Sequence, residues 1–333
     1  INRELTAAQE ISQLLRHPYA KKVDTFARGR VEMIKFRMNP ELHMDGLQVA
    51  DIISKMKCDI MICGVERQGQ VVIPNGDFVL KNNDLVSMMA VPKETAKFFR
   101  KMGIPTHQAK STLIVGGGTI AYYLAKQLLE MRVDVRIIEQ NKERCEMLSE
   151  QLPEATILQG DGTDKEFLLE EGLMHTDSFV ALTNMDEENL MLALLARKYS
   201  NAKLIAKVNR IHFEEVVDEL DIDSVIYPKN LAADHIVRYT RAMQNSLGSN
   251  VETLYKILDG QAEALEFVIR EDSSVTNQRL MDLPLKDHLL VCYISRYGKL
   301  KMARGQDMLK VGDSVIIVTT HKGLHDITDI LKY

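Results

Sequence analysis

The feature that most constrains the fold of this chain is that one segment of its sequence occurs twice. Seven of the twenty residues from 67 to 86 are identical, without a gap, to the residues that stand 229 positions later. Because self-similarity at a fixed spacing is typical of a duplicated structural unit, we predict two small domains of one α+β fold. The match continues upstream at an offset of 231, where Gly29 pairs with Gly260, Glu32 with Glu263, and Phe36 with Phe267.

The first residues belong to the same duplication. Residues 2–16 match residues 227–241 at an offset of 225, and residues 227–241 close the segment between the two small domains. We therefore interpret residues 1–26 as the last helix of a first nucleotide-binding unit that is mostly missing. The alternative, a natural protein that begins at this point, would leave an amphipathic helix without its sheet. The parts are then this helix at 1–26, small domains at 27–100 and 246–333, and a complete nucleotide unit at 109–245.

The complete unit has the pattern of a Rossmann-like fold. Predicted strands and helices alternate along it with short connections. Such alternation predicts a doubly wound parallel α/β sheet, in which ligands bind at the carboxyl ends of the strands. The predicted strands are 112–115, 134–139, 155–161, 178–183, 203–208 and 224–227, and the predicted helices are 119–131, 164–172, 186–199, 213–220 and 230–244.

A glycine-rich turn follows the first of these strands. Gly116, Gly118 and Ala121 occupy the small positions of the motif G-x-G-x-x-[GA], which opens the first helix. Gly116 permits a tight turn, and Gly118 lets backbone amides approach a pyrophosphate at the helix N-terminus. Glu139 ends the next strand, 23 residues after Gly116, where an acid accepts hydrogen bonds from ribose hydroxyls. A carboxylate there repels a 2′-phosphate, so NAD or an adenosine nucleotide is favoured over NADP. The alternatives are a simple turn and a solvated charge.

The third strand ends in the sequence "GDGTD". Asp161 is placed to accept a hydrogen bond from adenine or from a ribose. Thr163 or Asp164 is placed to cap the following helix, since Thr and Asp accept hydrogen bonds from the free amides of a first turn. Helix capping alone is therefore an alternative explanation of this motif.

The fourth and fifth strands end in further polar residues. Thr183 and Asn184 are expected beside the phosphates or the nicotinamide, with Asp186 or Glu187 in the first turn of the next helix. Lys207 ends the fifth strand and is expected to neutralise a phosphate. The alternative for Lys207 is a surface lysine.

Other features exclude several classes of protein. The net charge of −5 gives no general attraction to nucleic acid, and apolar runs such as "DIMICGV" are far shorter than the roughly 20 residues of a membrane span. The four cysteines form no CxxC pair and are predicted to be free thiols. The sequence contains no zinc-protease motif, no nucleophile elbow and no loop for nucleotide hydrolysis. We therefore predict that the chain is not an enzyme, with no catalytic residue and no metal.

Two other functions remain open. One is an NAD-dependent oxidoreductase whose catalytic residue is unrecognised, and the other is an assembly module whose nucleotide unit is vestigial. A dehydrogenase needs a side chain that handles the proton of the substrate. The segment after the nucleotide unit is a copy of an earlier small domain, which is a poor place for one catalytic pocket. This favours a nucleotide sensor.

Taken together, these motifs resemble the RCK or KTN regulatory proteins of potassium channels and transporters. The resemblance rests on "LIVGGGTIAYYLAKQLLE", "VRIIEQNKERCEMLSEQLPEATILQGDGTD", "ALTNMDEENLMLALLARK" and "AKVN" in the nucleotide unit and on "LPLKDHLLVCYISRYGKLKMARGQDMLKVGDSVIIV" in the second small domain. It implies RCK N-domains and C-domains in tandem, as in the peripheral NAD-binding subunits of Trk-type potassium uptake systems. It also implies a cytoplasmic homo-oligomer, a tetramer for the intact chain, that lies on the inner face of the cell membrane and gates a potassium transporter.

The resemblance also implies which residues contact the nucleotide. Departures from the family pattern bear on the ligand: some ATP-responsive relatives have arginine where this chain has Thr119, and many members have arginine where it has Lys207. We therefore expect NAD or NADH, with ATP or ADP as alternatives. The implied contacts are Gly116, Gly117, Gly118, Thr119, Ile120, Glu139, Thr183 and Asn184.

Overall fold

The computed structural model divides the chain into two compact units, which are described separately. Unit one comprises residues 1–21 and 106–233, and unit two comprises residues 22–105 and 234–333. The predicted helices at 213–220 and 230–244, and the predicted boundary at 245, lie largely outside the described residues. The structure describes residues 2–27, 29–104, 106–210, 217, 220, 222–233, 236–237, 251–258 and 260–332.

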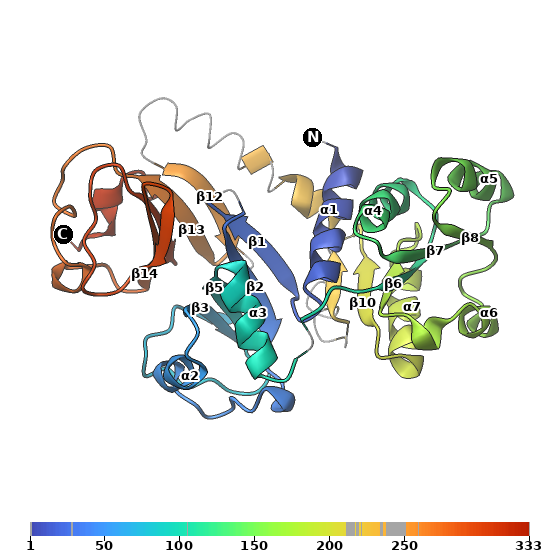
Figure 1. The fold of residues 1–333 in the computed structure, drawn as a ribbon, viewed down its shortest axis with the longest axis horizontal. Helices are drawn as coiled ribbons and strands as arrows, with labels where there is room; N and C mark the ends of the chain where they lie inside the picture. The colour runs from blue at the N-terminus through green and yellow to red at the C-terminus, as the bar shows by residue number, and fades with distance from the viewer. Residues whose placement is uncertain are drawn as a thin grey trace. The chain divides into compact units, whose positions relative to one another are not determined.

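Unit one contains a six-stranded parallel sheet whose strands have the order β8-β7-β6-β9-β10-β11 (Figure 1). This is the doubly wound order, with its winding reversed between β6 and β9. It confirms the predicted Rossmann-like fold and places the turn after β6 at the ligand-binding edge. The strands are β6 (Ser111–Val115), β7 (Asp134–Glu139), β8 (Thr156–Gln159), β9 (Ser178–Ala181), β10 (Lys203–Lys207) and β11 (Ser224–Ile226).

Helices follow most strands of this sheet. One core contains Leu113 and Val115 of β6 with Leu192 and Ala196 of α7, and the 3₁₀ turn η2 adds Leu173. Helix α5 was not predicted, because its sequence is charged and only Cys145 and Leu148 are buried on it. The helical elements are α4 (Thr119–Glu130), α5 (Lys142–Gln151), α6 (Lys165–Glu170), η2 (Leu173–His175) and α7 (Asp186–Tyr199).

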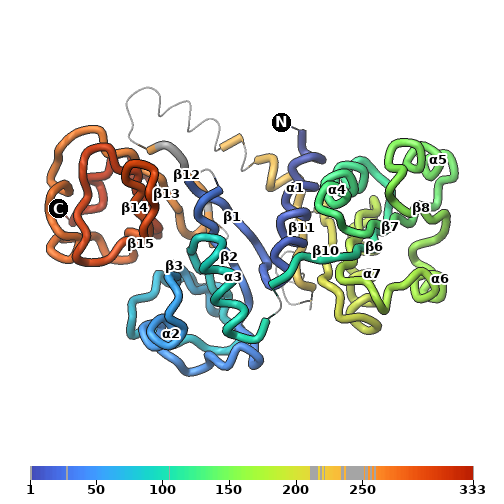
Figure 2. Tube along the Cα trace, in the orientation of Figure 1, coloured from blue at the N-terminus to red at the C-terminus, as the bar shows by residue number. Residues whose placement is uncertain are grey.

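The first helix of the chain, α1 (Arg3–Arg16), packs within unit one against α4 and β11 (Figure 2). The apolar residues of its inner face are fully buried at helical spacing, namely Ala7, Ala8, Ile11, Leu14 and Leu15. The segment after it is also attached, since the Lys203 Nζ donates to the Ala20 carbonyl at 2.6 Å and the Ser224 Oγ donates to the Lys21 carbonyl at 3.2 Å. The apolar face of this helix is therefore buried on the sheet unit that the chain does contain.

The attachment at Lys203 predicts a pH-dependent stability. Burial lowers the pKa of Lys203 from 10.5 to about 8. The unfolded chain then binds this proton more tightly than the folded chain, so stability rises as pH increases through this range. Relative to Lys203→Met, the wild-type chain should gain about 2 kcal/mol of unfolding free energy between about pH 7.5 and 10. Urea unfolding of both proteins at the two pH values measures the difference, and an identical pH response would contradict the burial of a titrating amine.

Unit two contains two five-stranded antiparallel sheets of one topology. Their orders are β1-β2-β5-β3-β4 and β12-β13-β16-β14-β15, and both third strands carry a bulge, between Ile62 and Gly64 and between Val291 and Tyr293. The predicted duplication is confirmed down to this irregularity. The strands are β1 (Lys22–Phe26), β2 (Val31–Arg37), β3 (Ile60–Arg67), β4 (Gln70–Val72), β5 (Leu85–Ala90), β12 (Val251–Ile257), β13 (Ala262–Val268), β14 (Leu289–Arg296), β15 (Lys299–Met302) and β16 (Ser314–Thr319).

A buried ion pair explains the most similar stretch of the repeat. The Arg67 guanidinium donates to both carboxylate oxygens of Asp84 at 2.7 Å, and Arg296 makes the equivalent bidentate contact with Asp313. Both carboxylates are almost completely buried, so removing the arginine of either pair would leave an uncompensated buried charge. The identical residues at an offset of 229 therefore hold the same loop in both small domains.

The two small domains differ in their helices. The first has a 3₁₀ turn η1 (Pro40–Leu42), helix α2 (Val49–Met56) and helix α3 (Pro92–Lys101). At the corresponding places the second has the 3₁₀ turns η3 (Leu280–Asp282) and η4 (Ile327–Ile330). In the part of the chain that the structure describes, no helix is both long enough and apolar enough to span a membrane.

Candidate functional site

The glycine turn after β6 contains two glycines with different structural demands. Gly116 has φ of +99°, and a Cβ on it would lie 2.9 Å from the carbonyl carbon and oxygen of Leu182. Only glycine fits that position. Gly118 has φ of −70° and ψ of −173°, which any residue adopts, and a Cβ on it would meet no atom of the described residues within 4 Å. Gly118 is thus the exposed N-cap of α4, where free helix amides and the helix dipole favour an anion.

Glu139, at the end of β7, holds the turn in place. Its Oε2 accepts a hydrogen bond from the Gly117 N–H at 2.8 Å, and its Oε1 accepts one from the Asn141 N–H at 2.9 Å. Each carboxylate oxygen can accept a second hydrogen bond. Glu139 therefore orders the glycine turn and keeps acceptor capacity for a hydroxyl group beside it.

Two further residues at this corner were not predicted from the sequence. Asn141 caps α5 by accepting a hydrogen bond from the Arg144 N–H at 2.8 Å, and the Arg144 Nε donates to the Gly117 carbonyl at 2.6 Å. Arg144 thus places a cation over the same turn that Glu139 holds. The N-cap signal of Asn141 directly after a strand was available in the sequence.

The loop after β8 lies beside the end of β6. A Cβ on Gly162 would stand 2.3 Å from the Val115 Cγ1, so the backbones approach closely. The Asp161 Oδ1 accepts from the Thr163 N–H at 2.8 Å and from the Thr163 Oγ1 at 2.7 Å, and these bonds hold the pKa of Asp161 below its usual range. Asp164 caps α6 by accepting from the Glu166 N–H. The capping role belongs to Asp164, while Asp161 stays ionised and exposed at the strand end.

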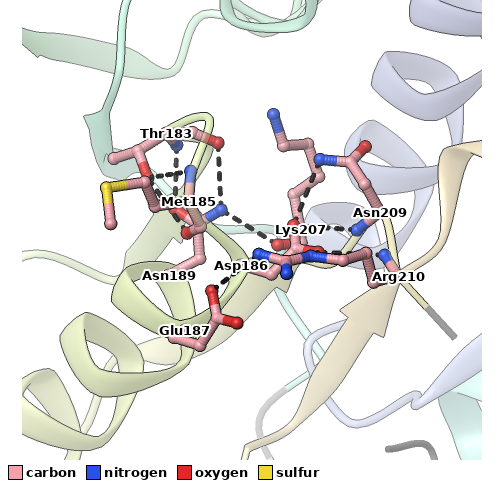
Figure 3. Close-up of polar contacts among 8 residues, drawn as sticks. All are labelled: Thr183, Met185, Asp186, Glu187, Asn189, Lys207, Asn209 and Arg210. Carbon is pink, nitrogen blue, oxygen red and sulfur yellow. Dashed lines mark hydrogen bonds and ion pairs between the residues drawn. The ribbon is translucent and has the colours of Figure 1, made fainter. Parts of the chain in front are cut away.

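Asn189 of α7 joins the ends of β9 and β10 (Figure 3). Its Oδ1 accepts from the Thr183 N–H at 2.8 Å, and its Nδ2 donates to the carbonyls of Thr183 at 3.1 Å and Lys207 at 2.9 Å. Asn189 is 0% exposed. It was not singled out in the sequence, where it stands inside a helix without any motif. Asn184, which was singled out in the sequence, is exposed and directly follows Thr183. The hydrogen bonds of Asn189 to Thr183 and Lys207 are called the clamp below.

Lys207 is not a surface lysine, since it is 7% exposed. Its Nζ donates to the Leu182 carbonyl at 3.4 Å, and Leu182 is the residue whose backbone borders Gly116. Burial lowers the pKa of Lys207, and the nearby Asp186 carboxylate opposes that shift. The amine is therefore placed at the edge where β6, β9 and β10 meet.

Asp186 organises the chain beyond β10 (Figure 3). Its carboxylate is almost fully buried and accepts from the backbone N–H groups of Asn209 and Arg210, each at 2.9 Å. Glu187 pairs with the Arg210 side chain at 3.1 Å. These two acids in the first turn of α7 thus have structural partners, which fixes the backbone just after Lys207.

The strand ends together form a polar rim of mixed charge. Helix amides and the buried Lys207 amine lie at the β6–β9–β10 side, with the Asp186 carboxylate nearby. The carboxylates of Glu139 and Asp161 lie at the β7–β8 side, where Arg144 contacts the glycine turn. Such a rim suits a ligand with an anionic part and a hydroxylated part. Within the described residues, no group of three or more His, Cys, Asp or Glu side chains could hold a metal ion, and the four cysteines are buried free thiols.

Family models match most of the chain. The TrkA-N domain matches residues 112–228, and the TrkA-C domain matches residues 33–103 and again residues 264–332. The Trk system potassium uptake protein TrkA homolog of Archaeoglobus fulgidus is 30% identical over 329 residues, covering 99% of this chain and 72% of the relative. TrkA homolog 1 of Methanosarcina mazei is 29% identical over 330 residues, with the same two coverages. These names are those of potassium uptake proteins, which confirms the prediction that the chain is not an enzyme.

Solved structures support the fold. The RCK domain of GsuK has a TM-score of 0.54 at 15% identity, over 94% of this chain and 66% of that one. The GsuK channel bound to NAD also has a TM-score of 0.54, at 14% identity, over 95% of this chain and 55% of that one. At such identities the likeness concerns the fold alone. With both domain types matched and a 30% identical relative aligned along 99% of this chain, the chain belongs to the TrkA family of Trk system potassium uptake proteins.

Proposed function

We propose that this chain is a regulatory subunit that binds NAD or NADH and thereby gates a Trk-type membrane potassium transporter. In this proposal residues 109–245 bind the nucleotide, and the small domains at 27–100 and 246–333 transmit its effect. ADP and ATP are the alternative ligands. The residues proposed to contact the nucleotide are Gly116, Gly117, Gly118, Thr119, Ile120, Glu139, Asp161, Thr183, Asn184 and Lys207.

The observation that carries the proposal is the difference between the two motif glycines. The fold requires glycine at Gly116, whereas no contact among the described residues requires it at Gly118. A glycine that the fold does not need, at the exposed N-cap of a helix, is explained by the close approach of a ligand to the backbone. The anion-binding end of the rim and the carboxylates of Glu139 and Asp161 then fit the pyrophosphate and the adenosine half of NAD.

The carboxylate of Glu139 predicts discrimination between two nicotinamide nucleotides. A negative charge at the ribose position disfavours a 2′-phosphate, so NADPH should bind at least about 10-fold more weakly than NADH. Glu139→Gln removes the charge and one of the two acceptors that hold the turn. Both affinities should fall, and their ratio should approach one. Calorimetric titration with each nucleotide measures the ratio, and a ratio that the substitution leaves unchanged would exclude Glu139 from ribose recognition.

The regulatory part of the proposal rests on the family and on linkage. The relatives are Trk system potassium uptake proteins, and one protein of the same fold is described as a channel bound to NAD. A nucleotide changes transport when it binds two states of the regulator with different affinities. The proposed partner is a membrane potassium transporter subunit, with the regulator peripheral on the cytoplasmic face as a homo-oligomer, tetrameric for an intact chain.

Potassium flux into proteoliposomes tests this part. The transporter subunit would be reconstituted with the chain, and flux would be measured with and without NADH. We expect a nucleotide-dependent change in flux that disappears with Gly118→Val. A potassium flux that depends on the chain but not on any nucleotide would show that the chain regulates transport without sensing a nucleotide. That result would overturn the gating proposal.

A further inference from the structure

The two small domains of unit two share one hydrophobic core. Its members include Ala27, Val31 and Cys63 of the first domain and Leu258, Cys292 and Tyr293 of the second. Strands β3 and β14, which are equivalent in the repeat, lie against each other in it. An element that contacts its own equivalent lies at a two-fold axis, so the domains pair face to face around an approximate two-fold.

Polar contacts at the rim of the shared core obey the same symmetry. The Arg30 Nη1 donates to the Gly298 carbonyl at 2.7 Å, and the Gln261 Nε2 donates to the Gly69 carbonyl at 3.2 Å. Arg30 and Gln261 are equivalent at the offset of 231, and Gly69 and Gly298 at the offset of 229. Each domain therefore makes the same hydrogen bond to the hairpin turn of the other.

The apolar side chains at the centre break this symmetry. Gly64 is equivalent to Tyr293, and Ala27 is equivalent to Leu258. Ala27 and Leu258 share a left-handed backbone, with φ of +50° and +51°, so their side chains start from the same local backbone geometry. A Cβ on Gly64 would stand 2.5 Å from the Leu258 Cδ1, and Leu258 is 3% exposed. Leu258 therefore fills the space that the missing side chain of Gly64 leaves.

The two-fold relates this contact to a second one. Applying it to Gly64 and Leu258 places Tyr293 against Ala27, and both of these residues are buried in the shared core. Each large side chain thus meets a small one: Leu258 meets Gly64, and Tyr293 meets Ala27. Equivalent residues of the two domains therefore differ in size, but the residues that face each other across the interface are complementary in size.

We propose that this interface selects unlike partners: the first small domain accepts the second and rejects another copy of itself. Two copies of the first domain would bring Gly64 against Ala27 and leave cavities. Two copies of the second would bring Tyr293 against Leu258 and overlap. The interface is then specific because both pairings of like domains are unfavourable. In an assembly of several chains, this face then joins a first domain to a second domain, within one chain or exchanged between two.

Exchange of equivalent residues in the full chain tests the proposal. The half exchange, Gly64→Tyr with Tyr293→Gly, reproduces both like pairings, because it puts the new tyrosine against Leu258 and the new glycine against Ala27. The full exchange adds Ala27→Leu and Leu258→Ala, which restores a large-to-small match at both contacts. We expect the half exchange to lower the melting temperature by roughly 10 °C or more, and the full exchange to recover most of that loss.

A control exchange uses the same logic outside the core. Gln68 and Tyr297 are equivalent, exposed, and similar in backbone conformation, so Gln68→Tyr with Tyr297→Gln should leave the melting temperature unchanged. A full exchange that is no more stable than the half exchange would overturn the proposal.

A smaller pair of substitutions applies if these variants fail to fold. Gly64→Ala should be destabilising in the wild-type chain and tolerated when combined with Leu258→Ala, since the added methyl group then has space. Chemical unfolding of the two single variants and the double variant gives the coupling between the sites. Additive effects would show that Leu258 does not occupy the space above Gly64 and would also overturn the proposal.

Discussion

Gly118→Val is expected to lower the affinity for NADH by about 100-fold or more, while the melting temperature stays within about 2 °C of the wild type. The backbone at Gly118 suits any residue, and a Cβ there meets no atom within 4 Å in the part of the chain that the structure describes. The new side chain would instead occupy the space over the N-terminus of α4, where amides and the helix dipole would hold a pyrophosphate. Calorimetric titration and thermal unfolding of the same preparations measure the two effects separately.

The matched comparison is Gly116→Ala in the same turn. This smaller substitution puts a methyl group against the Leu182 carbonyl at a φ of +99°, so it should cost about 3 kcal/mol or more of unfolding free energy. Gly116→Ala would then reduce nucleotide binding because it destabilises the fold, whereas Gly118→Val would reduce it because the new side chain excludes the ligand. A Gly118→Val chain that binds NADH like the wild type would show that the turn faces no phosphate.

Asn189→Leu is expected to cost about 3 kcal/mol or more of unfolding free energy. Leucine has a similar size but cannot serve the three backbone groups that the buried amide satisfies, which are the N–H and carbonyl of Thr183 and the carbonyl of Lys207. Unsatisfied buried polar groups carry the full cost of their lost hydration. Nucleotide affinity should fall as well, because the ends of β9 and β10 lose their common anchor. Urea unfolding and NADH titration check both.

Asn184→Ala separates the two consequences of that substitution. Asn184, which stands five residues before Asn189, has an exposed side chain. Removing that side chain should leave the stability unchanged and affect only the ligand affinity. Asn189→Leu with unchanged stability would contradict the role of Asn189 as a clamp. Unchanged NADH affinity in a destabilised Asn189→Leu chain would instead show that the hydrogen bonds of Asn189 do not contribute to ligand binding.

Much of the fold could be predicted because local patterns decide it. Alternating apolar runs and helical spacing placed β7 at 134–139 and α7 at 186–199, which are the bounds observed. The repeat predicted two small domains of one topology. Helix α5 was missed because it buries only two side chains and therefore has little apolar periodicity.

The partners of the site residues could not be predicted in the same way. The strand-end rule identified Glu139, Thr183 and Lys207, because parallel strands bring their carboxyl ends to one edge. The hydrogen bonds that Asn189 makes to two strands, and the burial of Lys207, depend on tertiary contacts that no periodicity encodes. The pairing of unlike side chains between the small domains could not be predicted for the same reason. The difference between Gly64 and Tyr293 is visible in the repeat, but the residues that contact them are known only from the tertiary structure.

Nucleotide sensing is tested most directly by calorimetric titration of the wild-type chain with NADH, followed by recovery of the nucleotide. We expect saturable binding in roughly the micromolar range, about −8 kcal/mol, with NADH recovered intact and binding lost in Gly118→Val. Absence of heat for NADH, NAD, ADP and ATP at millimolar concentration, or recovery of oxidised nucleotide, would contradict a nucleotide-sensing regulator.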